Sequence, residues 1–234
     1  MSFVVLAITA AILLFILFHS IRFFVLVRTS AKLVEQSRCF ERRTDDGAPR
    51  ILVIGDSTGV GTGADPAFSI AGRLGSDFPD ASIHNESVNG WKTADALQNF
   101  PDVPAKSFDI ILLQIGANDI MRGTPLPEFC AALDSLFKKS TAAGKRVFAL
   151  HSGNIGLAPF FPWPLNSIMR TRTLRYRSEY QRIAAANGVT YVDLYHEAAD
   201  DPFQGRREFY ASDLLHLSAK GYADWYRTVR RAMK

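Results

Sequence analysis

The chain has 234 residues, of which 47% are hydrophobic, with a formal net charge of +4. This length suits one globular domain with its own core plus an appendage, and two cysteines exclude a disulfide framework. The basic residues favour no nucleic-acid partner, because one group follows an apolar segment and another recurs at helical spacing. These two groups are Arg22, Arg28, Lys32, Arg38, Arg42 and Arg43, and then Arg170, Arg172, Arg175 and Arg177.

The N-terminal segment is apolar enough to cross a membrane. Residues 3–18 are apolar except for Thr9, and apolar character resumes at 23–27. Since a spanning helix needs roughly 20 residues, we expect a transmembrane anchor at 1–27. A cleaved signal peptide and a buried core helix are the alternatives. No basic residue precedes Arg22, no small-residue cleavage site is evident, and the run leaves no polar face.

A charged linker is expected at 28–49, and a hydrolase domain at 50–234. The segment Thr44–Pro49 contains Asp, Gly and Pro, which are typical of a boundary. Six basic residues follow the predicted span, and this asymmetry predicts a single-pass protein with its catalytic domain in the cytoplasm.

Short apolar runs then alternate with longer helical patterns. Asp65-Pro66 is a favourable helix start, and Asn187-Gly188 is a favourable helix end. Five strands separated by helices predict parallel pairing and a three-layer α/β/α sandwich. The predicted strands are 51–54, 82–88, 109–114, 146–151 and 189–192, and the predicted helices are 66–78, 93–100, 126–143, 168–187 and 218–233.

Several polar residues follow the predicted strands. Ser57 follows the first strand, Asn118 follows the third, and Asp213 and His216 follow the fifth. Carboxyl ends of parallel strands meet at one edge of a sheet, so these residues should converge there. A serine hydroxyl needs a base to take its proton and a third group to orient that base. Ser57, His216 and Asp213 therefore predict a serine hydrolase.

Four motifs resemble the sequence blocks of the SGNH (GDSL-type) hydrolase superfamily. They are Gly55-Asp56-Ser57, Gly90, Gly116-Ala117-Asn118-Asp119 and Asp213-Leu214-Leu215-His216, in the family's order. Thr58 stands where many members carry leucine, which removes no reacting atom. The resemblance implies a flavodoxin-like version of the predicted fold.

The resemblance also implies a role for each matching residue. Ser57 would be the nucleophile, His216 the general base and then the acid, and Asp213 the group that orients the imidazole. The oxyanion hole would comprise the backbone N–H groups of Ser57 and Gly90 and the side-chain amide of Asn118. This mechanism requires no cofactor and no metal. We expect Asp56 and Asp119, which flank these groups, to brace loops.

Three further features remain open. Gly55-x-Ser57-x-Gly59 also fits the nucleophile elbow of α/β-hydrolases, although that serine usually lies in mid-chain. His151 ends the fourth predicted strand and is a candidate for substrate contact. The loop 156–165, with Phe160, Phe161 and Trp163, could wall an acyl chain, dip into the bilayer or fold onto the core.

The leading functional hypothesis is a membrane-tethered carboxylic ester hydrolase that forms an acyl-enzyme on Ser57. Its substrate would be a lipid, a thioester or an acetylated glycan, and its other partner the bilayer around the N-terminal helix. An O-acyltransferase with the same triad and an inactive binding protein that retains the fold are the alternatives.

Overall fold

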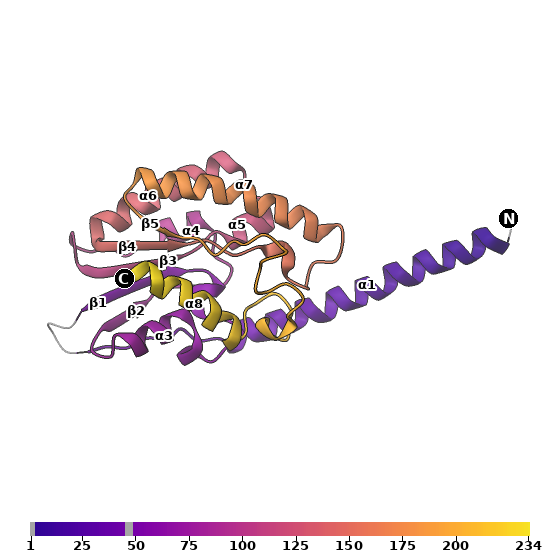
Figure 1. Cartoon of the computed structure of the whole chain (residues 1–234), viewed down its shortest axis with the longest axis horizontal. Coiled ribbons are helices and arrows are strands. Elements are labelled where there is room, and N and C mark those ends of the chain that lie inside the picture. The colour runs from indigo at the N-terminus through magenta and orange to yellow at the C-terminus, as the bar shows by residue number, and fades with distance from the viewer. Residues whose placement is uncertain (1–2, 45–48) are drawn as a thin grey trace.

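A computed structural model describes residues 3–44 and 49–234 of the chain. Its centre is a five-stranded sheet in which every pair of neighbouring strands is parallel, in the order β2-β1-β3-β4-β5 (Figure 1). The predicted parallel sheet is therefore confirmed, and its order is that of flavodoxin-like folds. The strands are β1 (Arg50–Gly55), β2 (Ser82–Asn85), β3 (Phe108–Gln114), β4 (Gly144–Leu150) and β5 (Thr190–Val192).

Helices cover both faces of this sheet, which gives the three predicted layers. One face packs mainly against α6 and α7, and the other packs against α3 and α8. The helices of the domain are α2 (Ser57–Val60), η1 (Pro66–Phe68), α3 (Ile70–Asp77), α4 (Thr93–Gln98), α5 (Ala117–Arg122), α6 (Leu126–Ala143), η2 (Ile155–Leu157), α7 (Leu165–Ala186), η3 (Arg207–Phe209) and α8 (Ala219–Met233).

Strand β1 shows why its sequence suits the centre of the sheet. Successive side chains of a strand point to opposite faces, and both faces of this sheet are covered. Ile51 and Val53 pack in the core on the α3 and α8 side, whereas Leu52 and Ile54 pack on the α6 and α7 side. All four are at most 1% exposed. Burying each such side chain contributes roughly 1.5–3 kcal/mol.

Two of the differences from the predicted element boundaries have clear local reasons. The helix predicted at 66–78 divides at Ser69, whose backbone is extended and whose Oγ accepts from the Gly72 N–H to start α3. The strand predicted at 82–88 ends at Asn85. The Asn85 side chain donates to Gly59 O and accepts from Ser87 N–H, which turns the chain away from the sheet.

The N-terminal helix α1 (Phe3–Gln36) extends from the domain as a 34-residue rod (Figure 1). Residues 3–18 are exposed, and contacts with the domain begin at Arg22 and Phe23. The predicted charged linker at 28–49 is thus helical as far as Gln36. Part of the predicted boundary, 45–48, lies outside the described residues. The helix therefore belongs structurally to the domain at its C-terminal end.

Arg42 joins the segment after α1 to the body of the domain. Its backbone forms a bridge with Ile83 of β2, and its guanidinium donates to the carbonyls of Gly75, Phe78 and Ala81. Gly75 and Phe78 lie at the C-terminal end of α3, where backbone carbonyls lack helical partners. A cation at this end is also favoured by the helix dipole. Arg42 therefore caps α3 from a distant part of the chain.

We expect Arg42→Ala to lower the free energy of unfolding by about 2–4 kcal/mol. Hydrogen bonds from a charged group contribute about 1.5–3 kcal/mol each, and the total is reduced because the Arg42 side chain is partly exposed. Arg43→Ala, the exposed neighbour, is the matched control and should change it by less than about 0.5 kcal/mol. Denaturant unfolding in detergent compares the two variants. Equal stability of both would contradict the assigned role of Arg42.

Candidate active site

Ser57 lies at the junction between β1 and α2, and its neighbours hold it there. Gly55 packs so closely on β3 that an added Cβ would lie 2.3 Å from Gln114 O. Asp56 is fully buried, and its Oδ1 accepts from the N–H and the hydroxyl of Thr58, both at 2.9 Å. Burial raises the pKa of Asp56 to about 6, although the Thr58 hydrogen bonds act to lower it. Asp56 therefore caps α2, as expected of a bracing residue.

The Asp213–His216 pair lies in a tight turn before α8. His216 Nδ1 donates to Asp213 Oδ2 at 2.5 Å, while Asp213 Oδ1 accepts from the backbone N–H groups of Leu215 and His216. Leu214 has a positive φ of 61°, a sparsely populated conformation that closes this turn. Burial alone would raise the pKa of Asp213, but the hydrogen bonds and charge of His216 outweigh it and hold this pKa below its ordinary value. The imidazole is thus oriented by an ionised carboxylate.

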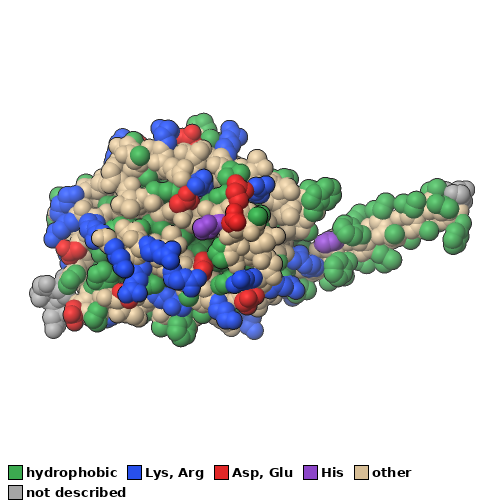
Figure 2. Space-filling view, in the orientation of Figure 1, with side chains coloured by type: hydrophobic (Ala, Val, Ile, Leu, Met, Phe, Trp, Pro, Cys, Tyr) green, Lys and Arg blue, Asp and Glu red, His purple; other side chains and the backbone are tan. Residues whose placement is uncertain are grey.

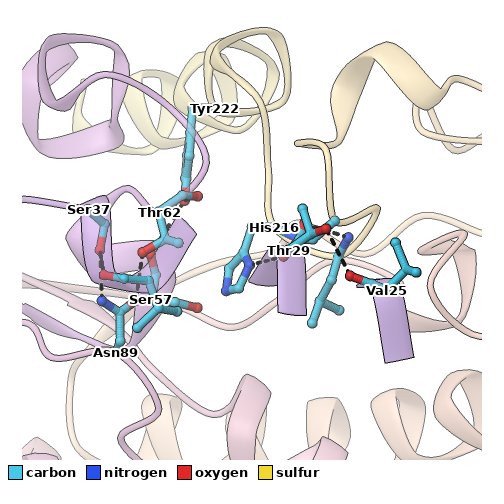
Figure 3. Close-up of polar contacts among 11 residues, drawn as sticks. Val25, Thr29, Ser37, Ser57, Thr62, Asn89, His216 and Tyr222 are labelled. Carbon is cyan, nitrogen blue, oxygen red and sulfur yellow. Dashed lines mark hydrogen bonds and ion pairs between the residues drawn. The ribbon is translucent and has the colours of Figure 1, made fainter. Parts of the chain in front are cut away.

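Ser57 and His216 line the same cavity, although they come from opposite ends of the chain. The space in this cavity that water can enter is about 90 Å³, and the cavity is open to solvent. Figure 3 shows the two residues at the site, with Ser57 at the start of α2 and His216 on the loop before α8. Within the described residues no hydrogen bond joins their side chains, and such bonds in unliganded sites commonly tighten only when substrate binds.

The predicted oxyanion donors come from three separate loops. Gly90 has a φ of +83°, which glycine adopts without strain. Asn118 is the second residue of α5, and its Nδ2 donates to Trp91 O at 3.0 Å, which ties the amide to the Gly90 loop. Ala117, directly before Asn118, lines the cavity with Ser57. Asp119 Oδ2 accepts from the N–H and hydroxyl of Thr93, so this carboxylate joins α5 to α4.

We expect Asn118→Ala to lower kcat for ester hydrolysis by roughly a hundred- to a thousandfold, because it removes a donor aimed at developing negative charge. KM should change little. Asn99→Ala, an exposed asparagine at the end of α4, is the control and should retain full activity. Steady-state kinetics with a p-nitrophenyl ester measures both. If Asn118→Ala keeps more than a third of wild-type kcat, Asn118 is not an oxyanion donor.

His151 is a predicted substrate contact, and the structure buries it directly before three residues that line the cavity. It is 1% exposed, packs against the Tyr180 ring and is not among the residues that line the cavity. Burial lowers its pKa to about 4, so the ring is neutral near pH 7. The residues that follow it, Ser152, Gly153 and Asn154, do line the cavity. A role of His151 in substrate binding stays a prediction and would have to act through these neighbours.

The three predicted aromatic residues of the 156–165 loop lie outside the cavity lining. Phe160 is buried and packs edge-on against Phe23 of α1, with ring centroids 5.6 Å apart. Phe161 is partly buried between the two cores, and Trp163 is 79% exposed. Within this loop the cavity is lined by Ala158, next to Ile155 at the start of η2. Whether the aromatics affect acyl selectivity stays a prediction.

Sequence reasoning missed one wall of the cavity, because the segment 194–210 has neither a regular pattern nor a motif. Its aromatic residues form a cluster in which Phe203 contacts Phe209, Tyr210 and Trp225. Paired aromatics in a loop were the only available signal. The cavity-lining residues from this region and α8 are Leu194, Asp201, Phe203, Tyr210 and Trp225.

The end of α1 is joined to the oxyanion loop by hydrogen bonds. Asn89 Nδ2 donates to Ser37 Oγ at 2.9 Å, and Thr62 Oγ1 donates to Asn89 Oδ1 at 2.6 Å (Figure 3). The hydroxyl of Tyr222 in α8 donates to Thr62 O. Because Asn89 directly precedes Gly90, the segment after α1 helps to fix the predicted donor loop.

Residues 53–223 of the chain match the model of the GDSL-like Lipase/Acylhydrolase family. The chain belongs to this family. The match includes Ser57, Gly90, Asn118, Asp213 and His216, and it confirms the resemblance drawn from the four motifs.

Known relatives of this GDSL-like protein agree on the fold. The esterase TesA of Pseudomonas aeruginosa is 28% identical over 108 residues, which cover 44% of this chain and 54% of TesA. The chain thus matches about half the length of that relative. A crystal structure of TesA superposes with a TM-score of 0.63 at 20% identity, covering 79% of this chain and 98% of that one. Axe2, an acetylxylan esterase from Geobacillus stearothermophilus, superposes with a TM-score of 0.60 at 22% identity, covering 82% and 96%.

Proposed function

We propose that this protein is a membrane-tethered carboxylic ester hydrolase that works through an acyl-enzyme on Ser57. The observation that carries the proposal is the meeting of Ser57 with the Asp213–His216 pair at one cavity. Membership of a family of lipases and acylhydrolases supports the same reaction class.

In the first half-reaction, Ser57 Oγ attacks the carbonyl carbon of the ester while His216 Nε2 takes the hydroxyl proton. The carbonyl oxygen becomes an oxyanion, stabilised by the N–H groups of Ser57 and Gly90 and the amide of Asn118. Asp213 stabilises the imidazolium that forms. His216 then gives its proton to the departing alkoxide, so that the alcohol leaves and the acyl group remains on Ser57.

In the second half-reaction, water replaces the alcohol. His216 takes a proton from the water, whose oxygen attacks the acyl carbon through the same oxyanion site. The bond to Ser57 Oγ then breaks, and His216 returns the proton to the serine. The products are a carboxylic acid and an alcohol, and the enzyme recovers its initial protonation state.

The chemical character of the cavity supports an acyl chain as the group that it receives. Most of its walls are apolar, and hydrophobic surface favours hydrocarbon over a sugar or a charged group. The apolar residues of the lining include Met121, Ile155, Ala158, Leu194, Phe203, Leu215, Leu217 and Trp225.

A panel of p-nitrophenyl esters from acetate to palmitate, assayed on the full chain in detergent, tests this function. We expect hydrolysis, with kcat/KM higher for acyl chains longer than acetate. Failure to hydrolyse any ester would contradict the proposal. Release of p-nitrophenol only when an alcohol acceptor is added would instead indicate an acyltransferase.

The proposed tether rests on α1. An 18-residue stretch of this helix has a mean hydropathy of 2.7 and no buried residue, which suits a membrane span and also a signal sequence. Two observations favour a retained anchor: Leu26 is buried against the domain, and Ser37 bonds to Asn89. Basic residues on the C-terminal flank, including Arg28 and Lys32, favour a cytoplasmic domain. Protease digestion of sealed vesicles tests this sidedness, and protection of the domain in inside-out vesicles would contradict it.

A further inference from the structure

The domain exposes large apolar side chains mainly at one place, the segment 162–168 that leads into α7. Trp163 is 79% exposed, Leu165 43% and Ile168 42%. Outside α1, the described residues include only two other exposed large apolar side chains, Phe68 and Val88. Exposed apolar side chains that cluster in one segment indicate an interaction surface.

This segment lies beside the point where α1 leaves the domain. The guanidinium of Arg22 donates to the carbonyls of Pro159 and Phe160, and the Phe23 ring packs on the Phe160 ring. Figure 2 shows hydrophobic side chains on the edge of the domain from which α1 projects, with basic side chains next to the helix. The loop at Pro159 and Phe160 is thus held at the same position along the axis of α1 as Arg22 and Phe23.

The length of α1 relates this level to a membrane. From Phe3 to Arg22 the helix rises about 29 Å, close to the roughly 30 Å thickness of a bilayer's hydrocarbon core. A span over these residues brings Arg22 to the headgroups. Because Arg22 is bonded to Phe160, the segment after Phe160 comes to the same interface, where Trp is enriched and basic side chains meet phosphates.

We propose that residues 162–168 form a bilayer-docking edge, in which Trp163, Leu165 and Ile168 insert into the boundary between headgroups and acyl chains of the membrane that α1 spans. The proposal rests on the membrane tether of the proposed function. The partner that this edge binds is the lipid bilayer itself, because the edge continues the apolar surface of α1 at the depth where α1 leaves the bilayer.

Docking at this edge also narrows the substrate class to acyl esters embedded in the bilayer. The Phe160 N–H donates to Leu214 O at 3.1 Å, and Leu214 lies between the triad residues Asp213 and His216 in sequence. One loop therefore contacts both the helix at the interface and the catalytic turn. Ala158 of this loop and His216 of this turn both line the cavity, so docking of the loop would bring the cavity to the membrane surface.

The test compares an embedded ester with a soluble one. The full chain and its Leu165→Ser/Ile168→Ser variant are reconstituted in phosphatidylcholine vesicles that contain p-nitrophenyl palmitate, and p-nitrophenyl acetate is supplied in the buffer. We expect the variant to hydrolyse the palmitate at least tenfold more slowly and the acetate at the wild-type rate. Phe68→Ser, which removes an exposed apolar side chain elsewhere, should leave both rates unchanged.

A fluorescence measurement tests the edge independently of activity. Lipids brominated on their acyl chains should quench the emission of the wild-type protein, and this quenching should be largely lost in Trp163→Phe. Equal quenching of both proteins, or equal loss of both ester activities in the double variant, would overturn the proposal. If the wild type hydrolyses neither ester, the proposed function fails, while the quenching result still decides whether the edge enters the bilayer.

Discussion

Ser57→Ala is expected to lower kcat for p-nitrophenyl ester hydrolysis by roughly a hundred-thousand- to a millionfold. The hydroxyl of Ser57 is the atom that would bond to the acyl carbon, so no other group at the cavity can replace it in this mechanism. Its backbone position is set by Asp56 and Gly55, whose contacts do not involve the Ser57 side chain. The variant should therefore fold normally and bind substrate.

Ser152→Ala is the matched control, because Ser152 lines the same cavity and has no place in the proposed chemistry. It should keep kcat within about threefold of wild type, a change worth less than 1 kcal/mol. Steady-state kinetics gives the activities, and thermal unfolding confirms equal folding. A Ser57→Ala enzyme with a tenth or more of wild-type kcat would contradict the assignment of the nucleophile.

His216→Ala is expected to produce a loss of similar size, because an unactivated hydroxyl is a weak nucleophile at neutral pH. The double variant Ser57→Ala/His216→Ala should lose little more than either single variant, since residues that act as a unit are strongly non-additive. The assay is the same ester kinetics. Multiplicative losses in the double variant would show that the two residues act independently.

His196→Ala provides the control for the histidine. His196 lies on the exposed surface after β5, so its removal should leave kcat/KM unchanged. A large loss in His196→Ala would place the base on a different loop from the one that carries Asp213.

The fold could be predicted because its strands are short apolar runs buried on both faces. Those runs differ plainly from the helical patterns between them. Strands that alternate with helices predict parallel pairing. Boundaries were less predictable, because single side chains set them. Ser69 starts α3 with its hydroxyl, and Asn85 ends β2 by bonding to Gly59 and Ser87. Neither contact leaves a periodic signal.

The meeting of Ser57 and His216 at one cavity follows from topology, since both lie at carboxyl ends of a parallel sheet. The contacts that α1 and the segment after it make with the domain could not be inferred in this way. Ser37 reaches Asn89 and Arg42 reaches the end of α3 across more than 30 residues of chain. Such long-range contacts depend on exact placement, and a charged segment after an apolar helix looks like a linker from composition alone.

These contacts bear on how the protein should be prepared. A soluble fragment that begins near Pro49 lacks Ser37 and Arg42, and with them the bonds to the Gly90 loop and to α3. Experiments on the site should therefore use the full chain in detergent or vesicles.

Covalent capture by a fluorophosphonate probe tests the account most directly, because only an activated serine displaces fluoride from phosphorus at an appreciable rate. We predict a single phosphonyl adduct on the wild-type chain, located on the peptide that contains Ser57 by mass spectrometry. The adduct should be absent from His216→Ala. A wild-type protein that remains unlabelled, or that carries the adduct on Ser152 instead, would contradict the claim that Ser57 and His216 form the catalytic pair.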